Sequence, residues 1–246
     1  MIVIAGNTHD DILYFDTVLA NKKEDVLLNR FKVSIGTIFN QEVLVVHECT
    51  SSVLASALMT YILGQYYVDL VIVVGRCISI DKDVRNGDII VSKQIIDCNI
   101  DLSTQGDTIL GQYPGMPREF VVQQDILEYL LKGLRRRSFV PSHVLNVLTT
   151  DNMASEQVEY LKKNHSLFGI KDEFVLDNNS SGVALACTLK SVPCITIKVA
   201  ENKIEQTSNI DTYLNVLTRY VDLGKAVVST INDIGRNDIL EGNKLR

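Results

Sequence analysis

Two short runs of the chain decide its fold class, namely Leu70-Val-Ile-Val-Val-Gly75 and Asp88-Ile-Ile-Val-Ser-Lys-Gln-Ile-Ile-Asp97. Both runs are rich in β-branched residues, and the first has no polar residue before its glycine. A strand with one face in water alternates apolar and polar side chains, whereas a strand covered on both faces reads as a continuous apolar run. The two runs therefore predict buried strands in a sheet that carries helices on both faces.

Outward from these runs, β-branched segments alternate with longer segments whose apolar residues recur at helical spacing. In the segment 51–66, for example, Leu54, Leu58 and Ile62 fall on one stripe of a helix. We predict strands at residues 1–5, 31–39, 42–47, 70–74, 88–97, 143–149 and 194–200, and helices at residues 51–66, 122–134, 155–163, 181–189 and 209–234. This alternation is typical of the α/β class.

The pair Asn40-Gln41 separates two predicted strands by too few residues for a helix, so this pair predicts a hairpin. One antiparallel hairpin among parallel crossovers makes the central sheet mixed. The fold that we predict is therefore α/β, with three αβα layers around a mixed central sheet.

The length and composition suit one domain. The chain has 246 residues, of which 46% are hydrophobic, and this supplies enough apolar surface for the core of one large domain. No repeat, low-complexity tract or linker divides the chain, so we expect a single domain over residues 1–246. The least regular part is the segment 98–119, where glycines and prolines concentrate. Connections of this length usually belong to a functional site or an interface.

Charge and hydropathy exclude several classes of function. Lys and Arg number 24 against 30 Asp and Glu, so the net charge of −6 gives no field that attracts nucleic acid or anionic lipid. The basic segment 132–137 either binds an anion or complements the negative end of a helix. Apolar runs reach about six residues where a membrane span needs roughly 20, and residues 1–5 lack the basic flank of a secretion signal. We therefore expect a cytoplasmic protein with neither a nucleic-acid nor a membrane partner.

The cysteines and histidines give no sign of a metal. The five cysteines are widely spaced with no Cys-x-x-Cys pair, and the four histidines form no His-Glu-x-x-His motif. We therefore expect neither a disulfide framework nor a metal site, and we expect no cofactor. Cys77, which follows a predicted strand, is either a reactive thiol or a small core residue.

Several further segments occur in an informative order. They are Met-Ile-Val-Ile-Ala-Gly at 1–6, Asp-Val-Arg-Asn-Gly-Asp-Ile-Ile-Val-Ser at 83–92, Asp-Leu-Ser-Thr-Gln-Gly at 101–106, Gly-Gln-Tyr-Pro-Gly-Met-Pro at 111–117, Thr-Thr-Asp-Asn-Met-Ala-Ser at 149–155, and the segment 191–202, which opens with Ser-Val-Pro. In this order they resemble the purine nucleoside phosphorylase and uridine phosphorylase superfamily over nearly the whole chain. The resemblance is strongest to the 5′-methylthioadenosine/S-adenosylhomocysteine nucleosidase branch.

The resemblance implies a phosphorylase-like fold that hydrolyses the N-ribosyl bond of an adenine-type nucleoside without a cofactor. It places the family's water-orienting carboxylate on Asp11, its ribose-binding carboxylate on Asn179 and its purine acid on Asn202. The family's purine-stacking phenylalanine corresponds to Met153. The resemblance also implies a homodimer, in which the loop around Pro114 covers the pocket of the neighbouring subunit.

Asparagine at two of the three carboxylate positions weakens the expected chemistry. Asn202 has no proton to give to a purine leaving group. Asn179, with Asn178 beside it, can bind ribose hydroxyls, but losing a charge-assisted contact to the cationic sugar costs about 1.5 to 3 kcal/mol. A rearranged loop could present Glu201 or Asp177 instead.

Two basic residues also depart from the family pattern. Lys198 replaces the arginine that precedes the last motif, and we assign it to substrate binding. Arg76 follows Gly75 at the place where the phosphorylase branches bind phosphate. A guanidinium there either binds an anionic ligand or fills the anion site with its own side chain.

Three hypotheses for function follow. The first is a nucleosidase of altered or weakened activity, in which Asp11 orients water, Asn202 or Glu201 holds the purine edge, Asn179 the ribose and Met153 the base. The second is a homologue that binds nucleosides, or serves as a scaffold, without turnover. The third is a phosphate-dependent nucleoside phosphorylase that uses its arginine for phosphate.

Overall fold

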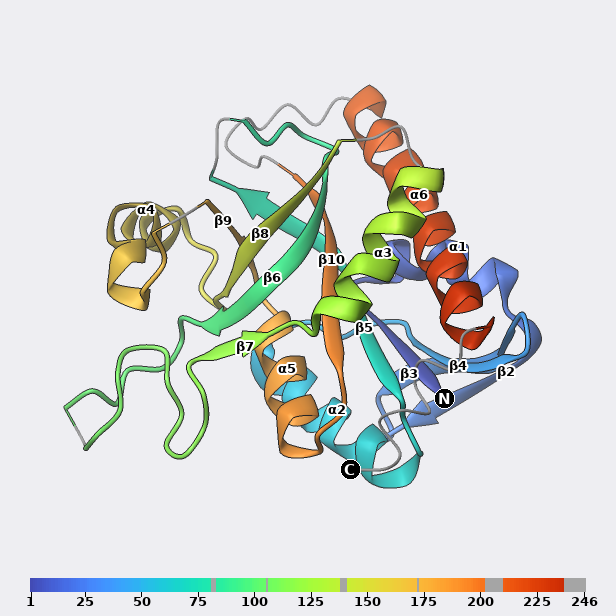
Figure 1. Cartoon of the computed structure of the whole chain (residues 1–246), viewed down its shortest axis with the longest axis horizontal. Coiled ribbons are helices and arrows are strands. Elements are labelled where there is room, and N and C mark those ends of the chain that lie inside the picture. Colours follow the sequence, from blue (N-terminus) through green and yellow to red (C-terminus); the bar gives the residue numbers. More distant parts are fainter. Residues whose placement is uncertain (81–82, 105, 138–140, 172, 202–209, 237–246) are drawn as a thin grey trace.

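The computed structural model describes residues 1–80, 83–104, 106–137, 141–171, 173–201 and 210–236, and Figure 1 shows their arrangement. The elements in chain order are β1 (Ile2–Gly6), α1 (His9–Val18), β2 (Ala20–Leu27), β3 (Phe31–Ile38), β4 (Gln41–Val46), α2 (Ser52–Gln65), β5 (Leu70–Ser79), β6 (Ile89–Asp97), β7 (Glu119–Val121), α3 (Gln124–Arg137), β8 (Ser142–Thr149), α4 (Ser155–Asn164), η1 (His165–Phe168), β9 (Phe174–Asp177), α5 (Ser180–Leu189), β10 (Cys194–Ala200) and α6 (Ile210–Arg236). The predicted α/β class is confirmed.

The sheet is mixed, and half of it closes on itself. β10 pairs with β5 in parallel and with β6 in antiparallel fashion, β6 continues to β8, β8 to β9, and β9 returns to β5. From this ring β1, β4, β3 and β2 extend as an open sheet, with β1 parallel to both β4 and β5. The closed ring is the feature that a prediction of three layers did not contain.

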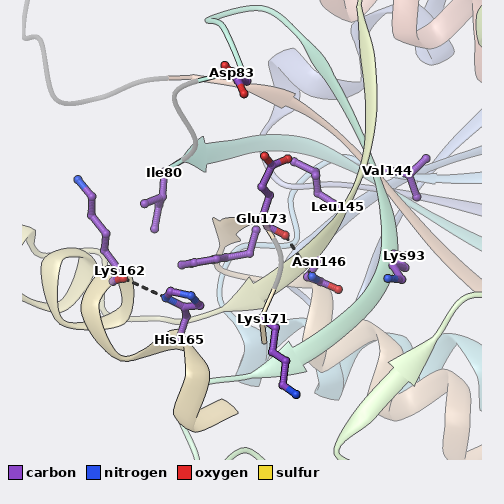
Figure 2. A pocket seen from close by; sticks show the side chains of 11 residues that line it. Ile80, Asp83, Lys93, Val144, Leu145, Asn146, Lys162, His165, Lys171 and Glu173 are labelled. Carbon is purple, nitrogen blue, oxygen red and sulfur yellow. Dashed lines mark hydrogen bonds between the residues drawn. The ribbon is translucent and has the colours of Figure 1, made fainter. Parts of the chain in front are cut away.

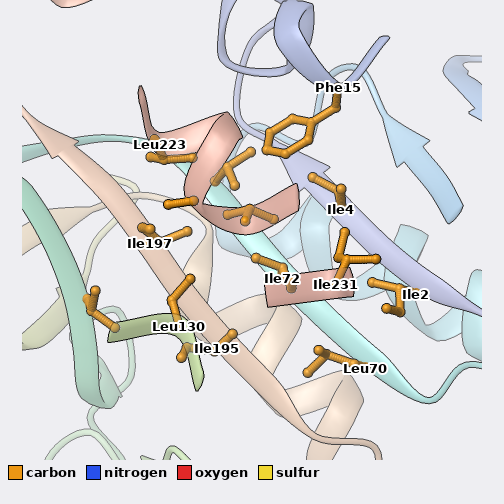
Figure 3. Close-up of a cluster of buried hydrophobic side chains, with 14 of the residues drawn as sticks. Ile2, Ile4, Phe15, Leu70, Ile72, Leu130, Ile195, Ile197, Leu223 and Ile231 are labelled. Carbon is orange, nitrogen blue, oxygen red and sulfur yellow. The ribbon is translucent and has the colours of Figure 1, made fainter. Parts of the chain in front are cut away.

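Side chains of the open sheet alternate between two apolar layers, as expected for strands that are covered on both faces. Ile2 and Ile4 of β1 pack with α1, α3 and α6, whereas Val3 packs on the opposite face with α2 and α5. Figure 3 shows the first layer, where Ile72 of β5 and Ile231 of α6 are among the buried side chains. Each such residue contributes about 1.5 to 3 kcal/mol by leaving water.

Each predicted strand and helix corresponds to an observed element whose bounds differ by a few residues, and the predicted hairpin joins β3 to β4. Its turn residues are Phe39 and Asn40, since Ile38 pairs with Gln41. Strand β5 continues beyond the predicted end at residue 74 to Ser79, because a glycine does not interrupt its pairing with β10.

Five elements were not predicted, namely α1, β2, β7, η1 and β9. β2 is an edge strand with an exposed, highly charged sequence, so it lacks the apolar signal of the other strands. β7 and β9 are too short to show a period. Of the helices that the structure describes, none combines the length and apolarity that a membrane crossing requires.

Candidate active site

The candidate site lies where β5 changes partners. Strand β5 pairs with β1 as far as Val74, and it pairs with β9 from Ile78 onward. Residues 75–77 between them pair only with β10 in the described part of the chain. Ligand sites of α/β folds commonly lie where strands separate at their carboxyl ends. The gap is therefore a natural place for functional side chains.

Gly75 lets polar side chains approach β5 closely at this gap. Its φ of 150° favours glycine, and a Cβ there would lie 2.9 Å from Cβ of Asn7. The same Cβ would lie 3.3 Å from Oδ2 of Asp11 and 3.4 Å from Nζ of Lys198. Asn7, Asp11 and Lys198 therefore surround one point of the backbone.

Asp11 is placed by the start of α1. Thr8 is the N-cap of this helix, and its backbone N–H and hydroxyl donate to Oδ2 of Asp11 at 2.6 and 3.0 Å. This is a capping box, which fixes the carboxylate relative to the helix. Asp11 is 1% exposed, and its Oδ1 atom accepts no hydrogen bond. Oδ2 is thus held by the helix cap, whereas Oδ1 makes no hydrogen bond.

Arg76 is surrounded by carboxylates. Its guanidinium lies 3.6 Å from Oδ2 of Asp10, 3.8 Å from Oδ1 of Asp11 and 3.6 Å from Oε2 of Glu201. Burial would lower the pKa of Arg76, but Tyr220, Glu201 and Asp11 together raise it. Three carboxylates and one guanidinium leave a local charge of −2. Such surroundings oppose the binding of a further anion.

Tyr220 of α6 completes this group. Its side chain is 3% exposed, and its hydroxyl lies beside Asp11 and Arg76 without a hydrogen bond of acceptable geometry. Burial raises the pKa of Tyr220, and the carboxylates of Asp11 and Glu201 raise it further. The hydroxyl is therefore protonated and can donate a hydrogen bond.

A second polar network lies on the other side of Gly75. Nζ of Lys198 donates to Oδ1 of Asn179 at 2.7 Å and forms an ion pair with Oδ2 of Asp177 at 3.0 Å. Lys198 and Asn179 are 0% exposed. Asn179 also donates from Nδ2 to the carbonyl of Cys49 at 2.9 Å. Both polar atoms of Asn179 are therefore already engaged within the protein.

The remaining predicted site residues are less tightly grouped. Glu201 is tied to β5, because its backbone N–H donates to the carbonyl of Cys77 at 2.8 Å. Met153 is partly buried against a cluster that includes Phe168, and Asn178 is partly buried after β9. Pro114 is exposed in the long loop. Asn202 lies outside the described residues, so its role stays a prediction.

The long loop is anchored by a different aspartate. Asp97, at the end of β6, accepts hydrogen bonds from Tyr113 Oη at 2.7 Å and from Ser181 Oγ at 2.9 Å. Asn99 donates to the same carboxylate from its backbone and side chain. The loop that precedes Pro114 is therefore fastened to the end of the sheet.

Cys77 is a core residue. It is 2% exposed, and burial raises the pKa of its thiol well above the ordinary value. A protonated, buried thiol is a poor nucleophile. Of the two interpretations of Cys77, the structure favours the core residue.

Sequence reasoning missed Asn7 and Tyr220, and it named Asp177 only as a substitute carboxylate. Tyr220 lies in a helix whose apolar period makes an aromatic residue look like part of the core, and it does pack with Leu223 and Phe15. Nothing local in the sequence separates its hydroxyl from that of any other buried tyrosine. Asn7 carried no signal beyond its place after β1.

An open cavity of about 960 Å³ lies elsewhere, beside α4, η1 and β8. Figure 2 shows Asn146 of β8 and His165 of η1 on its lining, with the His165 ring N–H donating to the carbonyl of Lys162 at 3.0 Å. None of the predicted site residues lines this cavity. Volume alone does not make an active site, and the buried, unpartnered carboxylate oxygen of Asp11 places the candidate site at β5.

Comparison with known proteins gives a family match over most of the chain. The model of the phosphorylase superfamily matches residues 2–232. A 5′-methylthioadenosine/S-adenosylhomocysteine nucleosidase of Buchnera aphidicola is 23% identical over 193 residues, which cover 77% of this chain and 79% of that protein. The nucleosidase of a Geobacillus strain is 19% identical over 235 residues, covering 94% and 98%.

Solved structures show the same fold. A structure described as a putative nucleosidase of this type from Borrelia burgdorferi, bound to adenine, superposes with a TM-score of 0.82 at 23% identity, covering 94% of this chain and 99% of that one. The nucleosidase of Neisseria meningitidis in complex with methylthio-immucillin-A gives a TM-score of 0.82 at 17% identity, covering 94% and 98%.

Proposed function

Since this chain belongs to the phosphorylase superfamily, we propose that it hydrolyses the N-ribosyl bond of an adenine-type nucleoside, more slowly than a site with three carboxylates would. The substrate class is that of its relatives, which are methylthioadenosine/adenosylhomocysteine nucleosidases. The observation that carries the proposal is the free Oδ1 atom of Asp11, buried at the gap in β5. A general base needs such an oxygen within reach of its proton donor.

In the proposed reaction Asp11 is the general base. A water oxygen forms a bond to the anomeric carbon and gives one proton to the carboxylate. The carbon–nitrogen bond breaks, and its electron pair leaves with the purine, which takes up a proton from solvent to become neutral adenine. Thr8 holds Oδ2 of Asp11, so the proton goes to Oδ1. General-base catalysis of this kind contributes typically about 10²- to 10⁴-fold.

The sugar and purine sides of the site explain the lower rate. Lys198 neutralises Asp177, so the carboxylate that lies nearest Asn179 among the described residues is already paired and stabilises a cationic ribose less. In our proposal Asn178 and Asn179 contact the ribose as neutral amides, and Met153 packs on the base. Asn202 or Glu201 holds the purine edge, and an amide there cannot supply a proton.

The phosphorylase hypothesis is disfavoured by the surroundings of Arg76. Its guanidinium already faces the carboxylates of Asp10, Asp11 and Glu201 at 3.6 to 3.8 Å. A phosphate that approached Arg76 would meet these negative charges at short range. The arrangement supports the alternative in which Arg76 fills the former anion site.

A non-catalytic nucleoside binder is the second candidate function. The specific observation in its favour is Asn179, whose oxygen and nitrogen are engaged by Lys198 and the Cys49 carbonyl. If these bonds persist in the complex, the ribose loses its main partner and turnover stops, while the base pocket still binds.

We also propose a homodimer in the cytoplasm. Pro114 and Ile109 are exposed on the long loop, with Ile109 at 49%, and a neighbouring subunit would cover them. The five free cysteines suit a reducing compartment. Light scattering of the purified protein tests the first part, since a monomer mass would contradict it.

Adenine release tests the proposed function. Purified protein is incubated with methylthioadenosine or adenosylhomocysteine, with and without phosphate, and products are separated by chromatography. The proposal predicts adenine and free sugar in both buffers. Release that requires phosphate would establish the phosphorylase instead. Thermal stabilisation by these nucleosides without any release would establish the binder.

A further inference from the structure

Two of the five free cysteines share one small pocket. Cys187 lies near the C-terminal end of α5, and Cys194 is the first residue of β10. Both side chains line a cavity of about 360 Å³, whose wall is completed by β7, which lies beside α5 (Figure 1), and by the residues just before β10. None of the predicted site residues lines this cavity. The pocket is therefore separate from the gap in β5.

The two thiols contact each other. The turn 188–193 leads the chain from α5 back to β10, and the backbone N–H of Val192 donates to the carbonyl of Cys187 at 2.9 Å. Both cysteine side chains pack in the same apolar cluster, and their thiols share a hydrogen bond. Residues 188–191 of the turn are exposed, so the turn can adjust. Two thiols in contact are placed to approach the S–S distance of about 2.05 Å that a disulfide requires.

The two thiols differ in exposure and in protonation. Cys194 is partly exposed, whereas Cys187 is 1% exposed. The hydrogen bond with Cys194 raises the pKa of Cys187 well above its ordinary value, and burial raises it further. Since the thiolate is the nucleophile, Cys187 is a poor first reactant. Cys194 is the thiol that a small oxidant reaches, and Cys187 lies beside it as a resolving partner.

We propose that Cys187 and Cys194 form a redox-active dithiol site, which closes to a disulfide when hydrogen peroxide enters the pocket and reopens by exchange with a small thiol. First, the sulfur of Cys194 bonds to one peroxide oxygen, the oxygen–oxygen bond breaks, and the other oxygen leaves as water with the proton lost by Cys194. Next, the sulfur of Cys187 bonds to that of Cys194, the sulfur–oxygen bond breaks, and the hydroxyl leaves with the Cys187 proton as a second water. The two thiols together give two electrons to one peroxide.

The other three cysteines do not offer this combination. Cys49 and Cys77 are buried, and Cys98 is partly exposed. Burial raises the pKa of each of these thiols, and among the described residues no second thiol contributes to any of the three shifts. Cys98 therefore has an exposure like that of Cys194 but lacks a neighbouring thiol. It provides the matched control for the pair.

Peptide mapping of the oxidised protein tests the site. Wild-type protein is treated with hydrogen peroxide, its remaining thiols are alkylated, and it is digested with trypsin without reduction. Trypsin cleaves after Lys190, which is exposed between the two cysteines, so the disulfide would join two separate peptides. We expect this linked pair, with a loss of two hydrogen atoms in mass, and we expect dithiothreitol to release it. Oxidised Cys194 without the link, or a link between other cysteines instead, would overturn the proposal.

Three variants assign the roles of the two thiols. Cys194→Ser should form no link and keep its remaining thiols open to alkylation in denaturant, whereas Cys98→Ser should form the link as the wild type does. In Cys187→Ala, which keeps a small apolar side chain in the core, we expect Cys194 to stop at the sulfenic acid, which dimedone traps. Loss of the link in Cys98→Ser, or no dimedone adduct on Cys194 in Cys187→Ala, would contradict the proposal. If a variant does not fold, the linked peptides of the wild type still decide the question.

Discussion

Two buried aspartates, Asp97 at the end of β6 and Asp11 in the first turn of α1, behave in opposite ways. Asp97 accepts hydrogen bonds from Asn99, Tyr113 and Ser181, and both of its oxygens are engaged. Asp11 is equally buried, but only its Oδ2 atom accepts hydrogen bonds. Each aspartate also has a tyrosine nearby, and only that of Asp97 donates to it.

The two aspartates show how a structural polar group differs from a reactive one. A buried carboxylate that is fully hydrogen-bonded stabilises the fold and holds its neighbours, as Asp97 holds the long loop. A buried carboxylate with a free oxygen is maintained at a cost, and it becomes available to a ligand or a water. We therefore expect substitutions at Asp97 to affect stability and substitutions at Asp11 to affect turnover.

The largest expected effect is on turnover in Asp11→Asn. The amide oxygen can still accept from Thr8, so the capping box and the fold are kept, but the general base is lost. We expect kcat for methylthioadenosine to fall at least about 100-fold, measured by adenine release. A variant that kept most of its activity would remove Asp11 from the chemistry.

The next effect is on stability in Asp97→Ala. The hydroxyls of Tyr113 and Ser181 would lose their acceptor, and each unmet buried donor costs about 1 to 3 kcal/mol. We expect the free energy of unfolding to fall by about 2 to 4 kcal/mol in denaturant titrations. If Asp97→Ala lowered the free energy of unfolding as little as Asp11→Asn does, the two aspartates would not differ in their structural role.

Tyr113→Phe isolates one bond of the Asp97 network. The variant removes the donor at 2.7 Å and keeps the ring of Tyr113. We expect the free energy of unfolding to fall by about 1 kcal/mol, and we expect a protease to cleave the loop 98–119 faster. Cleavage rates equal to those of the wild type would show that this hydrogen bond does not hold the loop.

The sequence predicted the strands and helices of this protein better than the side chains that meet around Asp11. Continuous apolar runs such as Leu70 to Val74 identify buried strands from local composition alone. The closed ring depends on which strands meet, and no local pattern encodes that β9 returns to β5. Asp11 was found through the family resemblance, whereas Tyr220 lies far along the chain in a helix. Its approach to Asp11 is a consequence of tertiary packing.

The smallest expected effect is a pH dependence from His47. Burial lowers its pKa, although Asp16 opposes this shift. A histidine whose pKa is lower in the folded state stabilises the protein above its unfolded pKa of 6.5, and this contribution is lost as the pH falls below that value. We therefore expect the free energy of unfolding to be lower at acidic pH than at neutral pH.

His47→Gln should remove that part of the pH dependence, whereas His165→Gln should keep it, since His165 lies at η1 away from Asp16. Parallel denaturant titrations between pH 5 and 8 compare the variants. If the free energy of unfolding changed equally with pH in the wild type and in His47→Gln, His47 would not be the source of the pH dependence.

A single-turnover experiment in phosphate-free buffer shows whether Asp11 activates water for cleavage of the N-ribosyl bond. Protein in excess over methylthioadenosine is quenched at successive times, and adenine and methylthioribose are quantified. We expect stoichiometric formation of both products by the wild type and a rate at least about 100-fold lower for Asp11→Asn. Equal rates for the two proteins, or no adenine from the wild type even when the nucleoside is bound, would contradict it.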